Sequence, residues 1–287
     1  MEVLKMDTVS KKLNDLTFTD YYYRLNLIAR SVFRWKGLPN YINEKWIERY
    51  LFYEGCCLFF EDKTKGFMVC KTTPSGRLNY YDEPTLLTPY GTGYMGKPLE
   101  NDKDCVLIQN NDLLLPTHPT IQLYAYRLAD ISRTIDINIS AQKTPYIMTT
   151  NDKTKLSSKI LFKQIAGNEI AIYADKGLDL DSVSILKTDA PVVFPELQVQ
   201  KHSIWNECMT FLGVNNANMD KRERLVANEV QANNEQIQIS ADVMLKARQR
   251  ACDMINDLFG LNVSVELRND LQTEIPNDSE GVPEGDE

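Results

Sequence analysis

The chain has 287 residues, of which 43% are hydrophobic and 25% charged, an ordinary composition for one large globular domain or a few small ones. No apolar run approaches the ~20 residues that a membrane span needs, so no membrane anchor is predicted, and the N-terminal residues do not resemble a secretory signal. The formal net charge of −8 argues against a basic protein that coats nucleic acid. The last 17 residues hold six acids and no bases, and without them 32 basic side chains face 34 acidic ones. A nearly neutral body would bind phosphates only weakly.

The N-terminal residues predict two helices. Thr19 to Lys36 reads as the first, with Gly37 just beyond its end. The second should place four large side chains on one side: Ile42, Trp46, Tyr50 and Tyr53.

A β-hairpin should follow the helices. Residues 55–61 and 66–71 are apolar and flank the turn DKTKG. Residues 74–103 are rich in Pro, Gly and Tyr and read mostly as loop, with one strand near Leu86. CVLIQN at 105–110 reads as a further strand, so residues 1–117 predict an α+β unit.

The longest regular apolar pattern predicts a helix at 118–143. Six residues spaced 3, 4, 3, 4 and 3 apart share one narrow face, and all but the last are apolar: Ile121, Tyr124, Leu128, Ile131, Ile135 and Asn138. Pro119 suits the first helical turn, and Thr117 or His118 can cap it. Such a face fits an ordinary core helix, or a seam between helices of neighbouring copies.

The remaining residues predict a small subdomain, a second long helix and a loop. Residues 144–189 suggest three strands, at 146–150, 169–174 and 182–187, with a helix at 156–166. Residues 190–213 predict a helix that ends at Gly213. Residues 214–240 lack a sustained period and read as a long loop. Residues 241–270 predict a helix capped by Ser240 and a strand that pack back on the N-terminal unit, and the acidic residues 271–287 predict disorder.

Several short motifs fail to predict chemistry. GTGYMGKP at 91–98 matches the start of a phosphate-binding loop, but Pro98 replaces the hydroxyl residue, and neither a preceding strand nor a following helix is expected. The two histidines, His118 and His202, have no metal-ligand spacing or catalytic signature. The six cysteines lack paired spacings and read as buried free thiols. The sequence therefore predicts no cofactor, no metal and no enzyme activity.

Four longer runs carry a resemblance to a known family. They are NNDLLLPTHPTIQLYAYRLADI…NISAQKTP from 110, ILKTDAPVV at 185–193, WNECMTFLGVNNANMDKRERLVANEV at 205–230 and KARQRACDMINDLFGLNV at 246–263. In this order they resemble the head–tail connector, also called portal or upper collar protein, of small short-tailed phages. The resemblance covers roughly residues 16–270. It implies the portal fold: an α+β chain with long stem helices, a β-containing wing and a small α/β clip, assembled as a ring.

The resemblance also implies domains. Residues 1–117 and 241–270 would form the wing, 118–143 and 190–213 the stem helices, 144–189 the clip and 214–240 a channel loop. The ring would be dodecameric and would pass double-stranded DNA. Four basic residues would line its channel: Lys187, Lys221, Arg222 and Arg224. A short charged run can equally be a solvated face. Glu196 stands where some relatives place another lysine.

The implied partners are those of a capsid vertex: the major capsid and scaffolding proteins, the packaging ATPase, and the lower collar or tail protein. A packaging RNA stays open as a partner, although residues 1–15 hold three lysines against three acids, unlike the basic arm of RNA-binding relatives. The location would be the virion neck, after assembly in the host cytoplasm. The alternative is an oligomeric scaffolding or coiled-coil protein without a channel, which the clip and the long loop at 214–240 disfavour.

Overall fold

The computed structural model describes residues 2–143, 146–149, 184–187, 191–214 and 227–268, with side chains over residues 11–140, 142, 191–214 and 239–268. The chain divides into two units. One combines Met1–Tyr22 with Tyr124–Trp205, and the other combines Tyr23–Leu123 with Asn206–Glu287. We call them the helical unit and the sheet unit.

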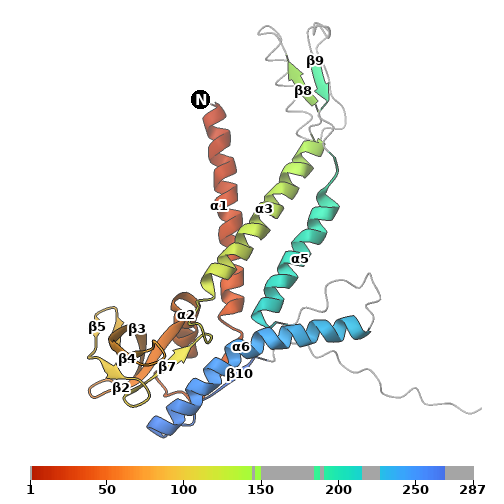
Figure 1. Cartoon of the computed structure of the whole chain (residues 1–287). Helices are drawn as coiled ribbons and strands as arrows, with labels where there is room; N and C mark the ends of the chain where they lie inside the picture. The colour runs from red at the N-terminus through yellow and green to blue at the C-terminus, as the bar shows by residue number, and fades with distance from the viewer. Residues whose placement is uncertain (1, 144–145, 150–183, 188–190, 215–226, 269–287) are drawn as a thin grey trace, which may run out of the picture. The chain divides into compact units, whose positions relative to one another are not determined.

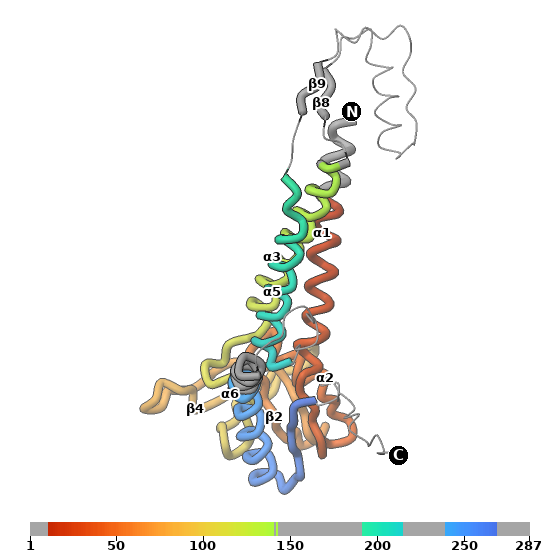
Figure 2. The backbone as a smooth tube through the Cα atoms, turned by 90° about the vertical axis from the view of Figure 1, so that its right-hand side faces the viewer, coloured from red at the N-terminus to blue at the C-terminus, as the bar shows by residue number. Residues whose placement is uncertain are grey.

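Three long helices supply the described core of the helical unit. They are parts of α1 (Glu2–Ala29), α3 (His118–Lys143) and α5 (Phe194–Leu212), which run side by side in Figures 1 and 2. Phe18 of α1 stacks on Tyr126 of α3 with ring centroids 4.1 Å apart. Tyr21 shares a 2.9 Å hydrogen bond with Ser132, and Lys201 of α5 lies over the ring of Tyr21. The helix predicted at 118–143 is therefore confirmed.

Two short strands stand between α3 and α5 in the sequence. β8 (Tyr146–Thr149) and β9 (Ser184–Lys187) pair antiparallel, with Tyr146 opposite Lys187. Both strands were predicted, to within two residues at their ends. The helix and third strand predicted for this segment lie outside the described residues.

The first predicted helix is wrong at both ends. α1 begins at Glu2 and ends at Ala29, and residues Phe33–Lys36 form strand β1 instead. Buried and exposed side chains alternate along β1, which is the period of a strand. Gly37 was expected to end a helix, but its φ is 72° and a Cβ there would lie 1.8 Å from the carbonyl oxygen of Asn262. A close approach to another segment, rather than a helix end, therefore requires this glycine.

The second helix, α2 (Glu44–Glu54), presents a different face to the core than the sequence suggested. Its N-cap Asn43 accepts a hydrogen bond from the amide of Lys45, and Gly55 ends it in a left-handed conformation. The buried residues are Ile47, Glu48, Leu51 and Phe52, whereas Trp46 and Tyr53 of the predicted face are 43% and 39% exposed. Because the charged residue Glu48 lies among these buried side chains, the spacing of apolar residues alone does not indicate which face of α2 is buried.

An antiparallel sheet forms the centre of the sheet unit. Its strands are β2 (Cys56–Asp62), β3 (Gly66–Leu78), β4 (Pro84–Gly91), β5 (Tyr94–Met95), β6 (Leu99–Glu100) and β7 (Cys105–Gln109). The order is β5-β4-β3-β2-β7, and β6 also pairs with β4. The predicted β2–β3 hairpin and the strand at 105–110 are confirmed. The strand predicted near Leu86 is confirmed as β4. The rest of the expected loop at 74–103 is wrong in part, because residues 74–78 belong to β3 and pair with β4, and because β5 and β6 also lie in this segment.

Alternate residues of the sheet face two different layers. Leu58, Phe60, Cys70, Leu87 and Cys105 form one buried cluster. On the same hairpin, Phe59 and Phe67 instead contact Phe259, at the end of α6 (Ala227–Phe259). The period of two along β2 thus fills both sides of the sheet with apolar side chains.

The C-terminal part closes the sheet unit. α6 contacts β7 and is followed by β10 (Ser264–Leu267), which pairs antiparallel with β1. The predicted packing of this helix and strand onto the N-terminal part is confirmed. The long loop expected at 214–240 is wrong from residue 227 onward, because α6 begins there and Ser240 lies inside it. Residues 227–240 contain several asparagines, which suggest a loop, but they also contain the good helix formers Ala, Gln and Glu, which favour a helix. None of the described helices is long and apolar enough to cross a membrane.

Candidate functional site in the long helices and a buried network

The predicted seam on α3 is largely buried within a single chain. Ile121 and Leu128 are fully buried, and Tyr124 is 7% exposed. Ile131 and Ile135 are half-buried. Since the first three side chains are already covered, they offer little surface to another copy. A seam between copies stays a prediction, and α3 also carries apolar side chains that are exposed: Leu123, Tyr126, Ile137 and Ile139.

Asn138, the polar member of the same face, joins α3 to the start of α5. Its side chain is 9% exposed, and its amide nitrogen donates a 2.8 Å hydrogen bond to the carbonyl oxygen of Pro191. Its side-chain oxygen accepts one of 3.3 Å from the amide of Val193. The pattern singled out this position, but only the fold shows that it satisfies backbone groups of the segment entering α5.

Most of the predicted channel residues lie outside the part of the chain that the structure describes. Lys187 is the last residue of β9, and only its backbone is described. Lys221, Arg222 and Arg224 lie outside the described residues. Their role in the channel therefore remains a prediction.

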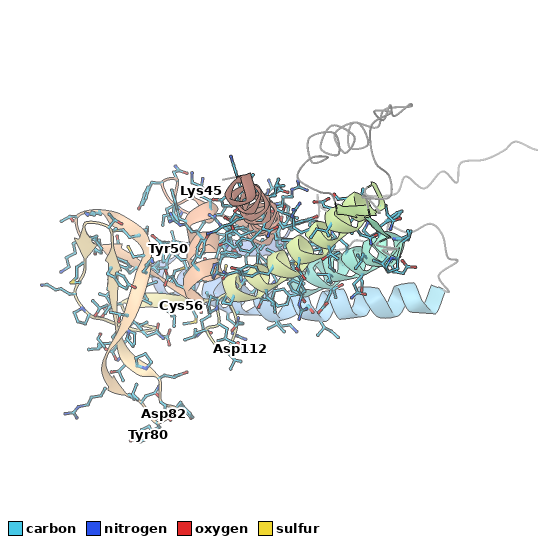
Figure 3. All side chains as sticks on the ribbon, turned by 90° about the horizontal axis from the view of Figure 1, so that it is seen from above. Lys45, Tyr50, Cys56, Tyr80, Asp82 and Asp112 are labelled. Carbon is cyan, nitrogen blue, oxygen red and sulfur yellow. The ribbon has the colours of Figure 1, made fainter. Side chains whose placement is uncertain are left out.

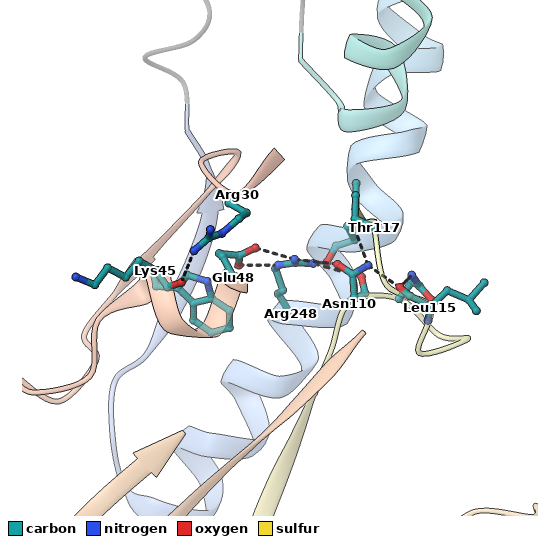
Figure 4. A network of polar contacts seen from close by, with 10 residues as sticks. Arg30, Lys45, Glu48, Asn110, Leu115, Thr117 and Arg248 are labelled. Atoms are coloured by element: carbon teal, nitrogen blue, oxygen red, sulfur yellow. Dashed lines mark hydrogen bonds and ion pairs between the residues drawn. The ribbon is translucent and has the colours of Figure 1, made fainter. Parts of the chain in front are cut away.

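A buried polar network in the sheet unit was missed by the sequence analysis. Its centre is Arg248 of α6, which is 2% exposed and donates five hydrogen bonds (Figure 4). Two go to the carboxylate of Glu48, from Nε at 3.0 Å and from Nη2 at 2.9 Å. Two go to the backbone and side-chain oxygens of Asn110, and one to the carbonyl oxygen of Met244. All five N–H donors of the guanidinium are thus used.

The partners of Arg248 are themselves held by other segments. Trp35 of β1 donates from its indole nitrogen to Glu48 at 2.9 Å. Asn110 follows β7 and donates to Thr117 and to the carbonyl oxygen of Leu115, on the path into α3. The network therefore connects β1, α2, the segment between β7 and α3, and α6. Full satisfaction of every donor is what makes a buried charge tolerable in a core.

One signal in the sequence could have revealed this network. Arg248 interrupts the row of buried α6 residues that contains Met244, Cys252 and Ile255, and Glu48 likewise interrupts the buried row of α2. Two opposite charges on two apolar faces suggest a buried ion pair, because charged side chains are almost never fully buried unless they are paired. Their pairing across 200 residues is visible only in the fold.

The other candidate chemical groups are structural in this arrangement. Burial raises the pKa of the Cys57 thiol, and it raises the pKa of Cys105 and Cys208 to about 12, which disfavours the reactive thiolate. His118 packs against the rings of Phe52 and Tyr53. Among the described residues, no group of three or more His, Cys, Asp or Glu side chains is placed to hold a metal.

The phosphate-loop match also has a structural explanation. β4 does precede residues 91–98, contrary to expectation, but β5 follows at Tyr94 where a phosphate loop needs a helix. Thr92 and Gly93 form the turn between β4 and β5, and beyond β5 the amide of Gly96 donates to the carbonyl oxygen of Pro89.

Comparison with known proteins gives a family for this fold. The model of the family described as Phage Connector (GP10) matches residues 4–272. A chain in the solved structure "Portal and tail of native bacteriophage P68" is similar with a TM-score of 0.51 and 13% identity, over 91% of this chain and 89% of that one. An HK97 family phage portal protein from Corynebacterium diphtheriae is similar with a TM-score of 0.45 and 8% identity, over 86% of this chain and 91% of that one. The chain therefore belongs to the phage connector family, and it is an α+β portal, or head–tail connector, protein of phage particles.

Proposed function

We propose that copies of this chain close into a dodecameric ring at one capsid vertex and that double-stranded DNA is packaged, retained and ejected through the ring. The observation that carries the proposal is the family match at residues 4–272, which covers α3, α5 and nearly all of both units. The protein performs no chemistry itself. It holds a channel open and joins other parts of the virion.

The dimensions of the helices suit such a channel. α3 has 26 residues, which at ~1.5 Å per residue gives a rod of about 39 Å. A dozen helices placed ~9.5 Å apart would form a ring about 36 Å across between axes, and one helix width of ~10 Å leaves a bore of about 26 Å. Such a bore is wide enough for duplex DNA.

The DNA contacts are assigned to Lys187, Lys221, Arg222 and Arg224. Exposed charges at physiological salt act over ~8 Å, so only phosphates near the wall would feel them. Each contact would contribute less than about 1 kcal/mol, which is weak enough for DNA to slide. The nearly balanced charge of residues 1–270 fits this need, because a strongly basic wall would immobilise DNA.

The proposed partners follow from the location. The major capsid and scaffolding proteins would surround the ring, the packaging ATPase would dock on it during filling, and the lower collar or tail protein would replace the ATPase afterwards. A packaging RNA remains an open partner, for which residues 1–15 supply no net positive charge.

Native mass spectrometry of the purified full chain tests the ring directly. We expect one closed assembly, with a central hole in negative-stain images. A monodisperse monomer at micromolar concentration would overturn the proposal.

The channel residues are tested by replacing Lys187, Lys221, Arg222 and Arg224 with alanine together. We expect intact rings that lose DNA from filled heads, measured as DNA retained per head. Lys246→Ala is the matched control, because Lys246 is an exposed lysine, 68% accessible, on α6. If retention is unchanged in normal rings, these charges are a solvated face and the channel wall lies elsewhere.

A further inference from the structure

The start of α2 presents two cations around an exposed indole ring. The Nζ of Lys45 lies over the ring of Trp46, 4.9 Å from its centre, and the guanidinium of Arg49 lies 5.9 Å from it. Trp46 is 43% exposed, and both cations are exposed beside it. Neither cation forms an ion pair with a carboxylate of the described residues. We call Lys45, Trp46 and Arg49 the basic patch, and its charges are available to an anionic partner.

The basic patch points away from the core of the sheet unit. Figure 4 shows the Lys45 side chain directed away from the buried network, while its carbonyl oxygen accepts a 3.4 Å hydrogen bond from Arg30. Figure 3 places Lys45 at the edge of the unit. The buried Nε atoms of Arg30 and Arg268, which both contact the start of α2, have no hydrogen-bond acceptor among the described residues. This corner therefore holds more cationic donors than the described part of the chain satisfies.

The last described strand leads directly to this patch. Arg268 follows β10, and its amide donates to the carbonyl oxygen of Val32. Its guanidinium donates to the carboxylate of Glu44 at 2.9 Å, and Glu44 directly precedes Lys45 in α2. Arg268 therefore contacts the neighbour of the basic patch, and the residues after Arg268 start from this point.

The residues that follow carry the complementary charge. Residues 271–287, which we call the acidic segment, hold six acids and no bases. They lie outside the described residues, and so does the disorder that the sequence predicts for them. Two of the acids, Glu274 and Asp278, flank the apolar pair Ile275–Pro276. The six residues from Arg268 to Glu274 can span about 20 Å when extended, so a patch that begins beside Arg268 lies within reach.

We propose that the acidic segment docks on the basic patch of its own chain, with its carboxylates at Lys45 and Arg49 and the Ile275–Pro276 pair on the ring of Trp46. Because the segment is tethered beside the patch, its effective concentration there is on the order of millimolar, so weak contacts are sufficient. Each exposed ion pair contributes little, which makes the docking reversible and sensitive to salt. The docked segment keeps phosphates and other anions off this surface. The inference does not depend on the proposed ring.

Cross-linking of the full chain with a carbodiimide tests the contact, because this reagent joins an amine to a carboxylate without a spacer. We expect peptides that link Lys45 to Glu274 or Asp278, from protein that keeps the monomer mass after denaturation. The product should be lost in ~1 M salt, where the Debye length falls to ~3 Å. Lys36 is the internal control, since it is 53% exposed on the neighbouring β1 but outside the patch. Equal yields at Lys45 and Lys36, or products only between two copies, would overturn the inference.

A substitution in the patch gives an independent result. Arg49→Gln leaves Lys45 as the reacting amine and should lower the yield of its product by about twofold to fivefold, the effect of one exposed ion pair. Arg250→Gln is the matched control, because Arg250 is 55% exposed on α6 outside the patch, and it should leave the yield unchanged. Equal yields for Arg49→Gln and wild type would contradict the docking.

Duplex DNA is the other anionic occupant that such a patch could take. The affinity of the full chain for a duplex oligonucleotide should be the same with and without Arg49→Gln, because the acidic segment occupies the patch. If Arg49→Gln weakens DNA binding by the full chain, the patch is a nucleic-acid surface and the inference is overturned.

Discussion

Removal of the buried guanidinium should destabilise the sheet unit strongly. Arg248→Met keeps an apolar stem in the core but leaves the Glu48 carboxylate, 3% exposed, with the indole of Trp35 as its remaining described hydrogen-bond partner. An uncompensated buried charge of this kind costs about 3–5 kcal/mol. Domains of comparable size lose roughly 2–4 °C per kcal/mol, so the melting temperature of this unit should fall by about 6–20 °C.

The neighbouring ion pair supplies a matched control. Arg250 lies two residues further along α6 and pairs with Asp112, but the two side chains are 55% and 70% exposed. Arg250→Met should therefore cost less than about 1 kcal/mol. The free energies of unfolding of both variants and of wild type are measured by denaturant unfolding, with circular dichroism as the signal. Equal, small losses for Arg248→Met and Arg250→Met would refute the argument from burial.

A double variant separates the charge from the packing. Arg248→Met with Glu48→Leu removes both charges and restores an apolar contact, which in other buried pairs is often neutral. It should be clearly more stable than Arg248→Met alone. It should not fully match wild type, because Asn110 and the indole of Trp35 lose their partners. A double variant as unstable as the single one would show that the hydrogen bonds of Arg248 to Asn110 and Met244, and not the unpaired charge of Glu48, account for the loss.

Three further predictions concern the two units separately. Asn138→Ala should destabilise the helical unit by about 1–3 kcal/mol, seen in denaturant unfolding, because it removes two hydrogen bonds from this buried side chain to the backbone before α5, each worth about 0.5–1.5 kcal/mol. The hydroxyl and amide of Thr64 hold the pKa of Asp62 well below its usual range, so this carboxylate stabilises the fold above its unfolded pKa and loses that effect as the pH falls. Thr64→Ala should raise the pKa of Asp62 in an NMR titration, and an unchanged pKa would contradict the assignment. Native protein at pH 8 should react with a thiol reagent only slowly and first at half-buried Cys56, since burial raises the pKa of Cys57 and the other buried thiols.

The local pattern of the sequence was sufficient for the long helices and the first hairpin. The 3-4 spacing from Ile121 predicts α3, whose ends agree with the structure, because a long amphipathic period is set by the residues of the helix itself. The turn DKTKG between apolar runs predicts β2 and β3 for the same reason. The family resemblance, carried by contiguous runs, is likewise confirmed by the family match.

Tertiary contacts decided what the local pattern could not. Phe33–Lys36 is a strand because β10, more than 200 residues later, supplies its hydrogen-bond partners. Residues 74–78 are a strand because β4 pairs with them, although their proline and glycine suggest a loop. Glu48 and Arg248 are core residues only because each neutralises the other. A sequence shows which side chains share a face of their own helix or strand. Which distant segment covers that face depends on the tertiary packing of the whole chain. The pairing of Glu48 with Arg248 was therefore visible only in the structure.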